Sequence, residues 1–512
     1  MIPNHFQIAI IGSGFGGSLS AMIARRLGFS VVLLERGKHP RFLIGESTTP
    51  LTNLLFEEIS TTYDLPGLRP LCKWGTWRSK TPQLPCGLKR GFTFYRHDLD
   101  QPFQPQADGR NQLLVGASPR DEVADTHWYR PDFDRFLVQQ AQALGVEYVD
   151  EIELNTAREL PGGMSLCGKR RGAELEFTAE FVVDATGPRG FLFRALNLPE
   201  RPLPGLPSTQ ALFSHFTNVS PLPAAFLRLE GRTPPYPAEH AAVHHVFPGG
   251  WIWVLKFNNG ITSAGVAATD PFANSINLRS GAPGWEQLLQ RLPALGDIFA
   301  SARHTVPFVH QARLAFQSDQ VVGQNWALLP SAAGVVDPLL STGFPLNLLG
   351  ILRIGKVLQV DWKKLSFGAA LETYGRRTKL ELETTARLVG ALYATMDRFD
   401  LFKTLSLLYF AAASFSEVSR RLGKPHLAEG FLLSGNSEFS PQLTEFCDLA
   451  TRHLSSEQAE TLKLRILKAI DPFDLAGLTD SRRDPWYPAR SEDIFRNAPK
   501  LGATREEIAT LP

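Results

Sequence analysis

The chain has 512 residues, of which 43% are hydrophobic and 20% charged, so it can build large cores and is not globally disordered. Its formal net charge of +2 gives no electrostatic reason to expect nucleic acid or an anionic membrane as the main partner. The 4 cysteines lack the spacing of a metal site or of a disulfide framework, which favours a reducing compartment.

The first predicted element is a strand that runs directly into a glycine-rich turn. Apolar residues 7–11 lead into Gly12, Gly14 and Gly17, and a helical pattern and a second strand ending in Glu35 follow. The first glycine of such a motif allows a tight turn, the second lets a pyrophosphate approach, and the third lets helix and strand pack closely. An acidic residue about 20 residues further on accepts a hydrogen bond from a ribose hydroxyl. This unit predicts a dinucleotide site.

A loop and two helices are expected next. Residues 36–50 are rich in Gly, Pro and small polar residues, and they leave the carboxyl end of the second strand, where open α/β sheets bind ligands. Helical patterns cover residues 51–59 and 133–144, the latter with Asp132 as a plausible N-cap. Arg130 beside this cap either reaches a phosphate or a carbonyl group, or is a solvated charge.

Aromatic and β-prone runs predict a second, antiparallel sheet. They fall within residues 71–97, notably at 73–77 and 87–95, and again within 210–310. Residues 98–120 are polar with Pro and Gly, and are expected to form an exposed loop.

Two later segments return the chain to the parallel sheet. A buried strand over residues 179–184 ends in Asp184-Ala-Thr-Gly187, and a strand near Trp326 leads to Asp337 and then to a helix with a glycine near its start. Such a helix start offers free N–H groups and the positive end of the helix dipole to an anion. The pattern after this helix is helical.

No targeting or membrane segment is evident. The nucleotide motif begins almost at Met1, which leaves no room for a signal peptide before it. The best apolar run, residues 405–415, is too short to span a bilayer and is expected to be a buried helix. We therefore expect a cytoplasmic protein without stable membrane insertion.

Several motifs together resemble the FAD-dependent monooxygenase superfold and, within it, the flavin-dependent halogenases, with the phenol-type members most similar. Beside the opening glycine motif and the Asp-Ala-Thr-Gly turn, they are Pro-Arg-Phe-x-x-Gly-Glu-Ser at 40–47, Gly-Leu-Lys-Arg-Gly-Phe-Thr-Phe at 87–94, Trp-Ile-Trp at 251–253 and Asp-Pro-Leu-Leu-Ser-Thr-Gly at 337–343. The resemblance covers residues 1–360 well and the helical remainder more loosely.

The resemblance implies an α/β protein of three parts. A Rossmann-like FAD-binding domain of the GR2, or p-hydroxybenzoate-hydroxylase-like, type would comprise residues 1–70, 130–200 and 320–360. A mainly antiparallel β substrate domain would comprise residues 71–129 and 201–319, and a helical C-terminal region residues 361–512.

It also implies a chemistry. FADH2 and oxygen give a flavin hydroperoxide, chloride or bromide attacks it, and hypohalous acid travels to a lysine that directs the halogen onto an electron-rich phenol- or pyrrole-like ring. The lysine would be Lys89, the halide would bind at Thr342 and Gly343, and Trp251 and Trp253 would shield the substrate from the flavin. The implied FAD-binding residues are Gly12, Gly14, Gly17, Glu35, Arg36, Ser47, Arg130, Asp184, Gly187, Asp337 and Phe344. No metal ligand is implied, and a separate flavin reductase would supply FADH2, because no NAD(P)H motif is evident.

The sequence departs from the family pattern at two places. Residues 254–256 are Val-Leu-Lys where the Trp-x-Trp-x-Ile-Pro signature ends in Ile-Pro, and Leu340 stands where tryptophan-type members carry a glutamate. The second departure argues against an indole substrate. From the residues alone, Lys89 is equally a solvent-facing strand lysine; Lys73 and Lys256 are weaker candidates.

Two alternatives differ in chemistry. A flavoprotein monooxygenase or dehydrogenase would transfer oxygen directly or pass hydride to FAD, and its product would not depend on halide. A flavin- or ligand-binding protein without enzymatic activity would show no turnover with reduced flavin.

Overall fold

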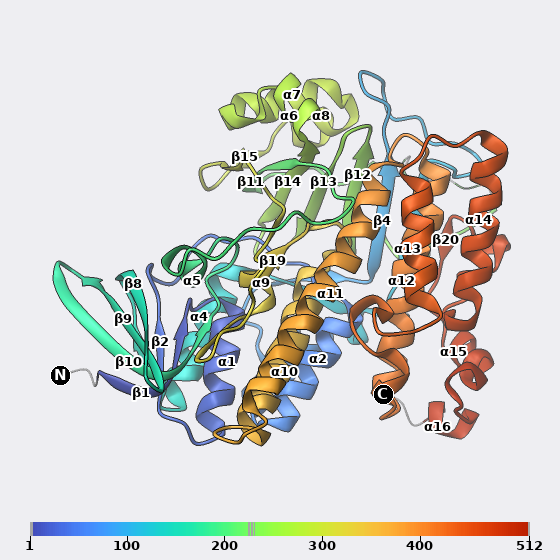
Figure 1. The fold of residues 1–512 in the computed structure, drawn as a ribbon. Coiled ribbons are helices and arrows are strands. Elements are labelled where there is room, and N and C mark those ends of the chain that lie inside the picture. The colour runs from blue at the N-terminus through green and yellow to red at the C-terminus, as the bar shows by residue number, and fades with distance from the viewer. Residues whose placement is uncertain (1–3, 224–225, 227–228, 230, 510–512) are drawn as a thin grey trace.

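The computed structural model describes residues 4–223, 226, 229 and 231–509 (Figure 1). The nucleotide motif opens its first sheet, which has the order β7-β2-β1-β10-β9-β8, with β18 also paired to β10. The strands are β1 (His5–Ile11), β2 (Val31–Leu34), β7 (Glu147–Val149), β8 (Ile152–Leu160), β9 (Gly163–Arg170), β10 (Ala173–Asp184) and β18 (Trp326–Leu328).

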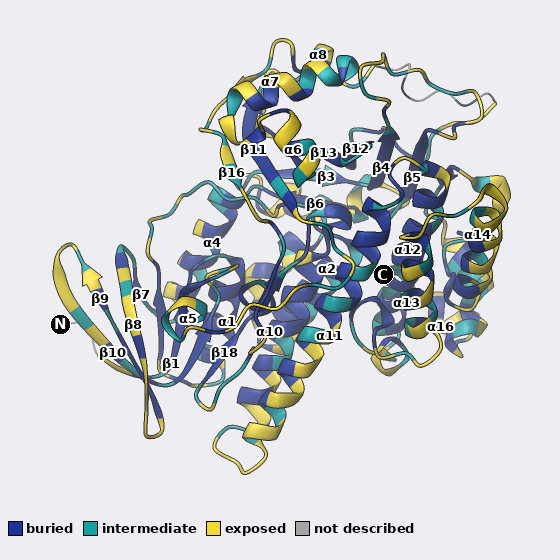
Figure 2. Ribbon diagram, turned by 45° about the horizontal axis from the view of Figure 1, so that its top comes forward, coloured by how far each residue is buried: buried dark blue, intermediate teal, exposed yellow. Residues whose placement is uncertain are grey.

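The long strand β10 organises this sheet. Its second half pairs in parallel with β1, so that Ile11 lies opposite Asp184, and its last residues also pair in parallel with β18. Its first half pairs antiparallel with β9. The parallel strands are buried because helices cover them, whereas β8 and the hairpin tip are largely exposed (Figure 2). The carboxyl ends of β1, β2, β10 and β18 therefore meet at one edge.

The second sheet has the order β15-β11-β14-β13-β12-β4-β5-β20, with β16 paired to β11. Its strands are β4 (Gly91–Arg96), β5 (Gln112–Gly116), β11 (Thr209–Thr217), β12 (Ala242–Phe247), β13 (Gly250–Lys256), β14 (Thr262–Thr269), β15 (Arg303–His304), β16 (Val309–Gln311) and β20 (Trp486–Tyr487). Two short pairs lie apart: β3 (Cys86–Lys89) with β6 (Asp125–Trp128), and β17 (Phe316–Gln317) with β19 (Gly334–Val335).

Helices cover both sheets (Figure 1). They are α1 (Phe15–Arg26), α2 (Pro50–Thr62), α3 (Trp74–Lys80), α4 (Arg130–Ala143), α5 (Phe191–Ala195), α6 (Asp270–Ser275), α7 (Ala282–Arg291), α8 (Pro293–Phe299), α9 (Pro330–Ala333), α10 (Gly343–Val360), α11 (Phe367–Tyr393), α12 (Phe399–Arg421), α13 (Phe439–Ala450), α14 (Ser456–Ile470), α15 (Ser491–Asn497) and α16 (Arg505–Ala509). Helix α1 contacts both α4 and α10.

Alternation along β4 divides the second sheet between two cores. Phe92 and Phe94 face α12, where their rings meet those of Phe410 and Phe402 at centroid distances of 5.3 and 5.9 Å. Tyr95 points the other way, into the core that α7 and α8 cover. Successive side chains of a strand point to opposite faces, so β4 joins the substrate-side sheet to the C-terminal helices.

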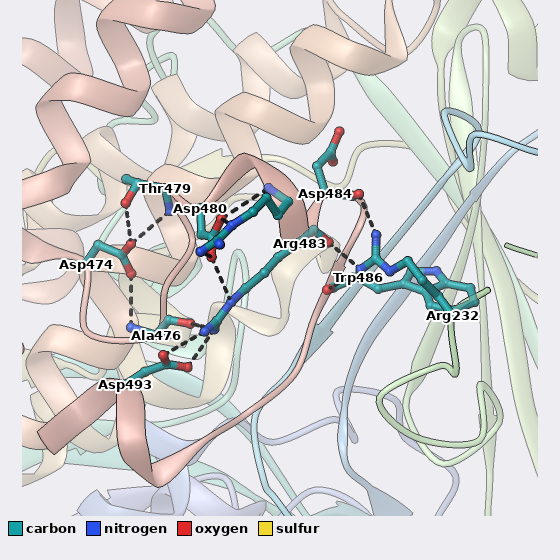
Figure 3. Close-up of polar contacts among 10 residues, drawn as sticks. Arg232, Asp474, Ala476, Thr479, Asp480, Arg483, Asp484, Trp486 and Asp493 are labelled. Atoms are coloured by element: carbon teal, nitrogen blue, oxygen red, sulfur yellow. Dashed lines mark hydrogen bonds and ion pairs between the residues drawn. The ribbon is translucent and has the colours of Figure 1, made fainter. Parts of the chain in front are cut away.

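The C-terminal segment is tied to the second sheet. Strand β20 pairs with β5, and Arg232 donates to the backbone carbonyls of Arg483, Asp484 and Trp486 (Figure 3). Arg483 is itself held by a bidentate pair with Asp493, at 2.6 and 2.7 Å. These guanidinium groups therefore hold the segment in place.

The predicted three-part α/β arrangement is confirmed, while the domain boundaries stay a prediction. Two local predictions were wrong. Residues 74–80 form α3 instead of a strand, because buried Trp77 donates its indole N–H to the Leu84 carbonyl, 2.9 Å away. The expected 98–120 loop contains the buried strand β5. The β-rich stretch 210–310 holds β11 to β14 as predicted, together with α6 to α8 at 270–299, and the C-terminal region is helical as predicted apart from the short strand β20.

Among the described helices, none combines the length and the apolar character needed to cross a bilayer. The described part of the chain also contains no group of three or more His, Cys, Asp and Glu side chains arranged to hold a metal ion. The cysteines are free, and Cys72, Cys86 and Cys447 are buried.

Candidate active site

The three glycines of the first motif face different surroundings. Gly12 has φ +95°, and a Cβ there would lie 2.8 Å from the Ala185 carbonyl oxygen, at the end of β10. A Cβ on Gly17 would collide with the carbonyl oxygen of Gly12. Gly14, in contrast, has room: its Cβ would be 3.5 Å from Arg130 Nη2, an ordinary contact. Gly12 and Gly17 thus shape the turn, and Gly14 leaves space open beside the start of α1.

Glu35 follows β2 and is buried against this turn. Its Oε2 accepts hydrogen bonds from the Ser13 N–H and hydroxyl, both at 2.9 Å, and from Arg41 at 3.2 Å. Its Oε1 accepts from the Gly37 N–H at 2.7 Å. Burial alone would raise the pKa of Glu35, but the Arg41 charge and these donors outweigh it and lower the pKa. The side chain is therefore an ionised acceptor fixed at the strand end.

Arg130 is buried, so the interpretation as a solvated charge was wrong. Its guanidinium makes a bidentate pair with Asp134, both contacts at 2.8 Å, and donates to the carbonyls of Ile44 and Gly45. It is the first residue of α4, whose N-cap is Tyr129, so Asp132 lies in the first turn and is not the cap. Arg130 thus reaches carbonyls and fixes the loop that follows β2.

The remaining residues predicted to hold the cofactor lie at different depths. Asp184 at the end of β10 is fully buried, and it accepts from Thr186 and from the Leu192 N–H of α5. Gly187 has φ +85°, and a Cβ there would have nothing within 4 Å. Arg36 is exposed. Ser47 receives a hydrogen bond from Lys89, described below.

A buried hydrogen-bond chain links Asp337 to the second sheet. Asp337 Oδ1 accepts from the Leu339 N–H at 2.9 Å, and its Oδ2 accepts from the Tyr393 hydroxyl at 2.9 Å. The same hydroxyl accepts from Trp251 Nε1 at 3.1 Å. Burial raises the pKa of Asp337 to about 6, against the lowering effect of these donors. Tyr393 of α11 therefore joins the Trp-x-Trp strand to the segment that precedes α10.

The predicted halide residues stand at the start of α10. Leu340 and Ser341 have positive φ angles of 66° and 56°, a conformation that L-residues rarely adopt, and Thr342 is the N-cap of the helix. No described side chain caps this helix, and a Cβ on Gly343 would have nothing within 4 Å. Phe344 turns inward, with ring centroids 4.5 Å from Trp128 and 4.9 Å from Phe15. The helix start thus offers unfilled space beside free backbone donors.

Trp251 and Trp253 are both buried on β13, with ring centroids 5.6 Å apart. On β14 they lie opposite Ala267 and Gly265, and a Cβ on Gly265 would collide with the Trp253 ring. Small residues on the neighbouring strand therefore make room for the two indoles.

Lys89, at the end of β3, is fully buried, so the solvent-facing alternative was wrong. Its ammonium donates to Ser47 Oγ at 2.9 Å and to the Thr48 carbonyl at 2.5 Å, and lies 3.8 Å from the Phe92 ring centroid. Burial lowers the pKa of Lys89 to about 7, while the Asp125 charge acts to raise it. The weaker candidate Lys256 is instead paired with Glu239 at 2.6 Å.

Sequence reasoning missed the residues around this amine. Asp125 lies directly opposite Lys89 across the β3–β6 pair, and Asn53 of α2 donates to its Oδ1 at 2.8 Å. Burial raises the pKa of Asp125 to about 7. His127 follows two residues later, on the same face of β6. The Asp-Thr-His-Trp run is short and polar, so it carried no strand signal.

A second missed pair lies where the loop meets the other sheet. Glu46 Oε1 is 2.7 Å from His215 Nε2, and both side chains are buried. The His215 ring stacks on that of Tyr129, with centroids 5.5 Å apart. Because Glu46 belongs to the Gly-Glu-Ser motif, this contact joins the loop after β2 to strand β11.

These surroundings fit FAD at the nucleotide end. Gly14 leaves a space that a Cβ would fill, no described side chain caps α1, and no acidic residue stands in its first turn. Free N–H groups at a helix start favour a pyrophosphate. Ionised Glu35 accepts three hydrogen bonds on Oε2 and one on Oε1, so Oε1 keeps a lone pair for a ribose hydroxyl.

The family model described as tryptophan halogenase matches residues 126–404, more than half of the chain. The chain belongs to the tryptophan halogenase family. The resemblance to flavin-dependent halogenases, drawn from the motifs, is thereby confirmed.

Individual relatives of this tryptophan halogenase family member show how far the similarity extends. The monodechloroaminopyrrolnitrin halogenase PrnC of Pseudomonas fluorescens is 30% identical over 350 residues, which are 66% of this chain and 59% of that protein. The tetracycline 7-halogenase of Kitasatospora aureofaciens is 26% identical over 418 residues, 80% of this chain and 73% of that protein. The crystal structure of halogenase PltM with phloroglucinol and FAD aligns with a TM-score of 0.81 and 23% identity, covering 94% of this chain and 99% of that one, and confirms the fold.

Proposed function

We propose that this protein is an FADH2- and oxygen-dependent halogenase that places chloride or bromide on an electron-rich aromatic small molecule of phenol or pyrrole type. The observation that carries the proposal is Lys89: a fully buried amine, held by Ser47 and Thr48, whose pKa burial lowers to about 7. A neutral amine is a nucleophile toward hypohalous acid, which a protonated surface lysine is not.

Each residue then has a role. Gly14, Glu35 and the start of α1 hold the FAD pyrophosphate and ribose, and Thr342 and Gly343 offer backbone N–H groups to the halide. Bound FADH2 supplies the oxidation of halide to hypohalous acid by oxygen. Trp251 and Trp253 keep the aromatic substrate away from the cofactor, so that the oxidant reaches it through Lys89. A separate flavin reductase provides the FADH2.

The substrate class follows from two features. Leu340 stands in place of the glutamate of tryptophan-type members, which argues against an indole. The rings of Phe92, Phe94 and α12 line the side of β4 nearest Lys89, and aromatic side chains favour a flat substrate. The PltM complex with phloroglucinol, a phenol, supports the same class.

The test is mass spectrometry of products. The protein is incubated with a flavin reductase, NADH and FAD, and with panels of phenols and pyrroles, in chloride and separately in bromide. We expect products that carry the isotope pattern of the halide supplied and that are absent without halide. An oxygenated product that forms independently of halide would instead establish a monooxygenase and overturn the proposal.

A further inference from the structure

Unpartnered polar atoms gather around Lys89. Within the described part of the chain, Asp125 Oδ2, both ring nitrogens of His127 and the Asn53 carbonyl oxygen are buried and have no hydrogen-bond partner. The backbone of Ala241 lies near His127 without reaching hydrogen-bond geometry. Buried polar groups are nearly always paired, and each unpaired one costs about 1–3 kcal/mol. So many unpaired polar atoms beside a buried amine indicate that these groups take part in the reaction.

The strand pairing fixes where these groups lie. Lys89 and Asp125 are direct partners across the antiparallel β3–β6 pair, and Gly87 and His127 form the next such pair on the same face. The His127 ring fills the space that Gly87 leaves, since a Cβ there would be 2.9 Å from His127 Cδ2. The carboxylate and the imidazole therefore flank the lysine from the same strand.

Lys89 directs its hydrogen bonds elsewhere. Its amine donates to Ser47 and Thr48, and Asp125 is held by Asn53 through Oδ1. Asp125 Oδ2 has no hydrogen-bond partner, so the carboxylate and the amine are cross-strand neighbours without a direct hydrogen bond. An ammonium has three donors, so one N–H of Lys89 is left for another acceptor. Ser47, Thr48 and Asn53 thus fix the positions of the amine and the carboxylate, while one N–H of Lys89 and Oδ2 of Asp125 stay available for proton transfer.

We propose that Asp125 is the proton partner of Lys89, exchanging a single proton with it during halogen transfer. This inference rests on the halogenase function proposed above. In this role Asp125 takes up and returns the proton of the lysine nitrogen and sets the charge beside it.

The steps balance. First the ammonium N–H bond breaks and the carboxylate O–H bond forms, giving a neutral amine and a carboxylic acid. The amine then attacks hypohalous acid, the oxidant: the N–halogen bond forms, the halogen–oxygen bond breaks, and the amine proton leaves with hydroxide as water. Finally the ring carbon takes the halogen, the carboxylic acid protonates the nitrogen as its bond to halogen breaks, and the ring proton passes to the amine. The ammonium and carboxylate are restored.

Other charges facing the pair are few. His127 of β6 and His244 of β12 are buried, and burial lowers their pKa values, to about 3 for His244, so both rings are neutral near pH 7. On α12, Tyr409, Glu417 and Arg421 face Asp125, and burial raises the pKa of the Tyr409 phenol. Within this set, Lys89 and Asp125 are the groups that change charge near neutrality.

A shared proton predicts a bell-shaped pH profile for halogenation. Product formation should fall below neutral pH as the pair takes up a second proton and above it as the pair loses its last one. Asp125→Asn removes the charge that raises the Lys89 pKa. Its acid limb should therefore move to lower pH, its alkaline limb should disappear, and its maximal rate should fall by about tenfold or more.

The measurement compares four proteins across pH 5.5–9, each with reductase-supplied FADH2, by product mass spectrometry and by trapping of free hypohalous acid with a thioether. Asp125→Asn should oxidise FADH2 like wild type, and the trap should capture more hypohalous acid than in wild type, because less of the oxidant ends in product. Asn53→Ala keeps both charges but removes a donor that lowers the Asp125 pKa, so its profile should move to higher pH. The matched control is Asp474→Asn, another buried carboxylate, held by Ala476 and Thr479, which should keep the wild-type profile.

Each outcome decides something. A wild-type rate and profile in folded Asp125→Asn would overturn the inference while leaving the proposed function intact. If that variant does not fold, an unshifted Asn53→Ala profile overturns the inference instead. A wild type without halide-dependent product overturns the proposed function, and the inference with it.

Discussion

The nucleotide end of this molecule, around Glu35 and Arg130, and the lysine end, around Lys89 and Asp125, hold their buried carboxylates in opposite ways. At the nucleotide end, both oxygens of Glu35 accept hydrogen bonds, from Ser13, Gly37 and Arg41, and Arg130 makes four hydrogen bonds to Asp134 and two carbonyls. At the lysine end, Asp125 and His127 leave polar atoms without partners. Both regions are built on strand ends next to the same loop.

This difference matches the two functions proposed for the regions, ligand binding at the nucleotide end and proton transfer at the lysine end. A site that grips a ligand with backbone donors needs its side chains fixed beforehand, and internal pairing fixes them. A site that moves protons needs groups whose charge can change, and full pairing would lock that charge. The unpaired groups cost stability, which a scaffold of this size tolerates when the rest of the chain is well packed.

Removing the amine should have the largest effect. Lys89→Ala should lower halogenated product by roughly 10²–10⁴-fold, the scale of losing a group that acts directly on the reacting atoms. FADH2 oxidation by oxygen should remain close to wild type, because it does not involve the amine, and hypohalous acid should leak to a thioether trap. Lys89→Arg should also fail, since a guanidinium stays protonated.

The control for this loss is Lys256→Ala, which removes a partly exposed lysine paired with Glu239. It should leave product formation within about twofold of wild type, as is usual for a surface ion pair. Halogenated product at the wild-type rate from Lys89→Ala would remove Lys89 from the mechanism.

A substitution at the nucleotide end should abolish FAD binding without altering the surroundings of Lys89. Gly14→Val should abolish FAD binding, because a branched side chain would occupy the space left for the pyrophosphate. The nearest atom to a Cβ at Gly14 is 3.5 Å away, so the protein itself should still fold. Flavin fluorescence titration measures the affinity, and Gly368→Val, at a helix position with nothing within 4 Å, is the matched control. Unchanged FAD affinity in folded Gly14→Val would contradict the placement.

The smallest effect should come from the hydrogen-bond chain that links Trp251 through Tyr393 to Asp337. Tyr393→Phe leaves Trp251 Nε1 without its acceptor and should lower the free energy of unfolding by about 1–3 kcal/mol. The folded-state pKa of Asp337 is raised, to about 6, so its burial opposes folding increasingly as pH rises from the unfolded pKa through that value. Losing the Tyr393 donor raises that pKa further, so the destabilisation should be larger at pH 8 than at pH 5.

Thermal unfolding at the two pH values measures this difference. Tyr374→Phe removes a hydroxyl that donates to the Leu328 carbonyl, an acceptor that does not titrate near these pH values, and its loss should be the same at both. Equal losses for Tyr393→Phe at pH 5 and pH 8 would show that its hydroxyl does not stabilise the Asp337 charge.

The local sequence pattern was sufficient to predict the nucleotide site, where the same residues serve the fold and the proposed function. The glycines at 12, 14 and 17 and the acid at 35 lie in one βαβ unit, so their spacing alone indicated their geometry. Lys89 was reached through a motif, since nothing in a strand lysine distinguishes a buried amine from a surface one. Its burial depends on Phe92 and on the loop after β2, which no local pattern reveals.

Tertiary packing determines the features that the local sequence pattern did not predict. Residues 73–77 were predicted to be β-prone because of their tryptophans, but Trp77 packs as a residue of helix α3. Asp125 and His127 acquire their meaning from pairing with β3, a contact between segments that are far apart along the chain. The role of Tyr393 also depends on tertiary structure, because its hydroxyl lies between Trp251 and Asp337, which are distant from it in sequence.

The loop of residues 36–50 has a consequence for engineering and for divergence within the family. Its beginning binds Glu35, its middle supplies the carbonyls that Arg130 holds, and its end supplies both acceptors of Lys89. The loop therefore couples the position of the Glu35 carboxylate to that of the Lys89 amine. A lysine introduced into another flavoprotein without this loop would lack the acceptors that position the Lys89 amine here.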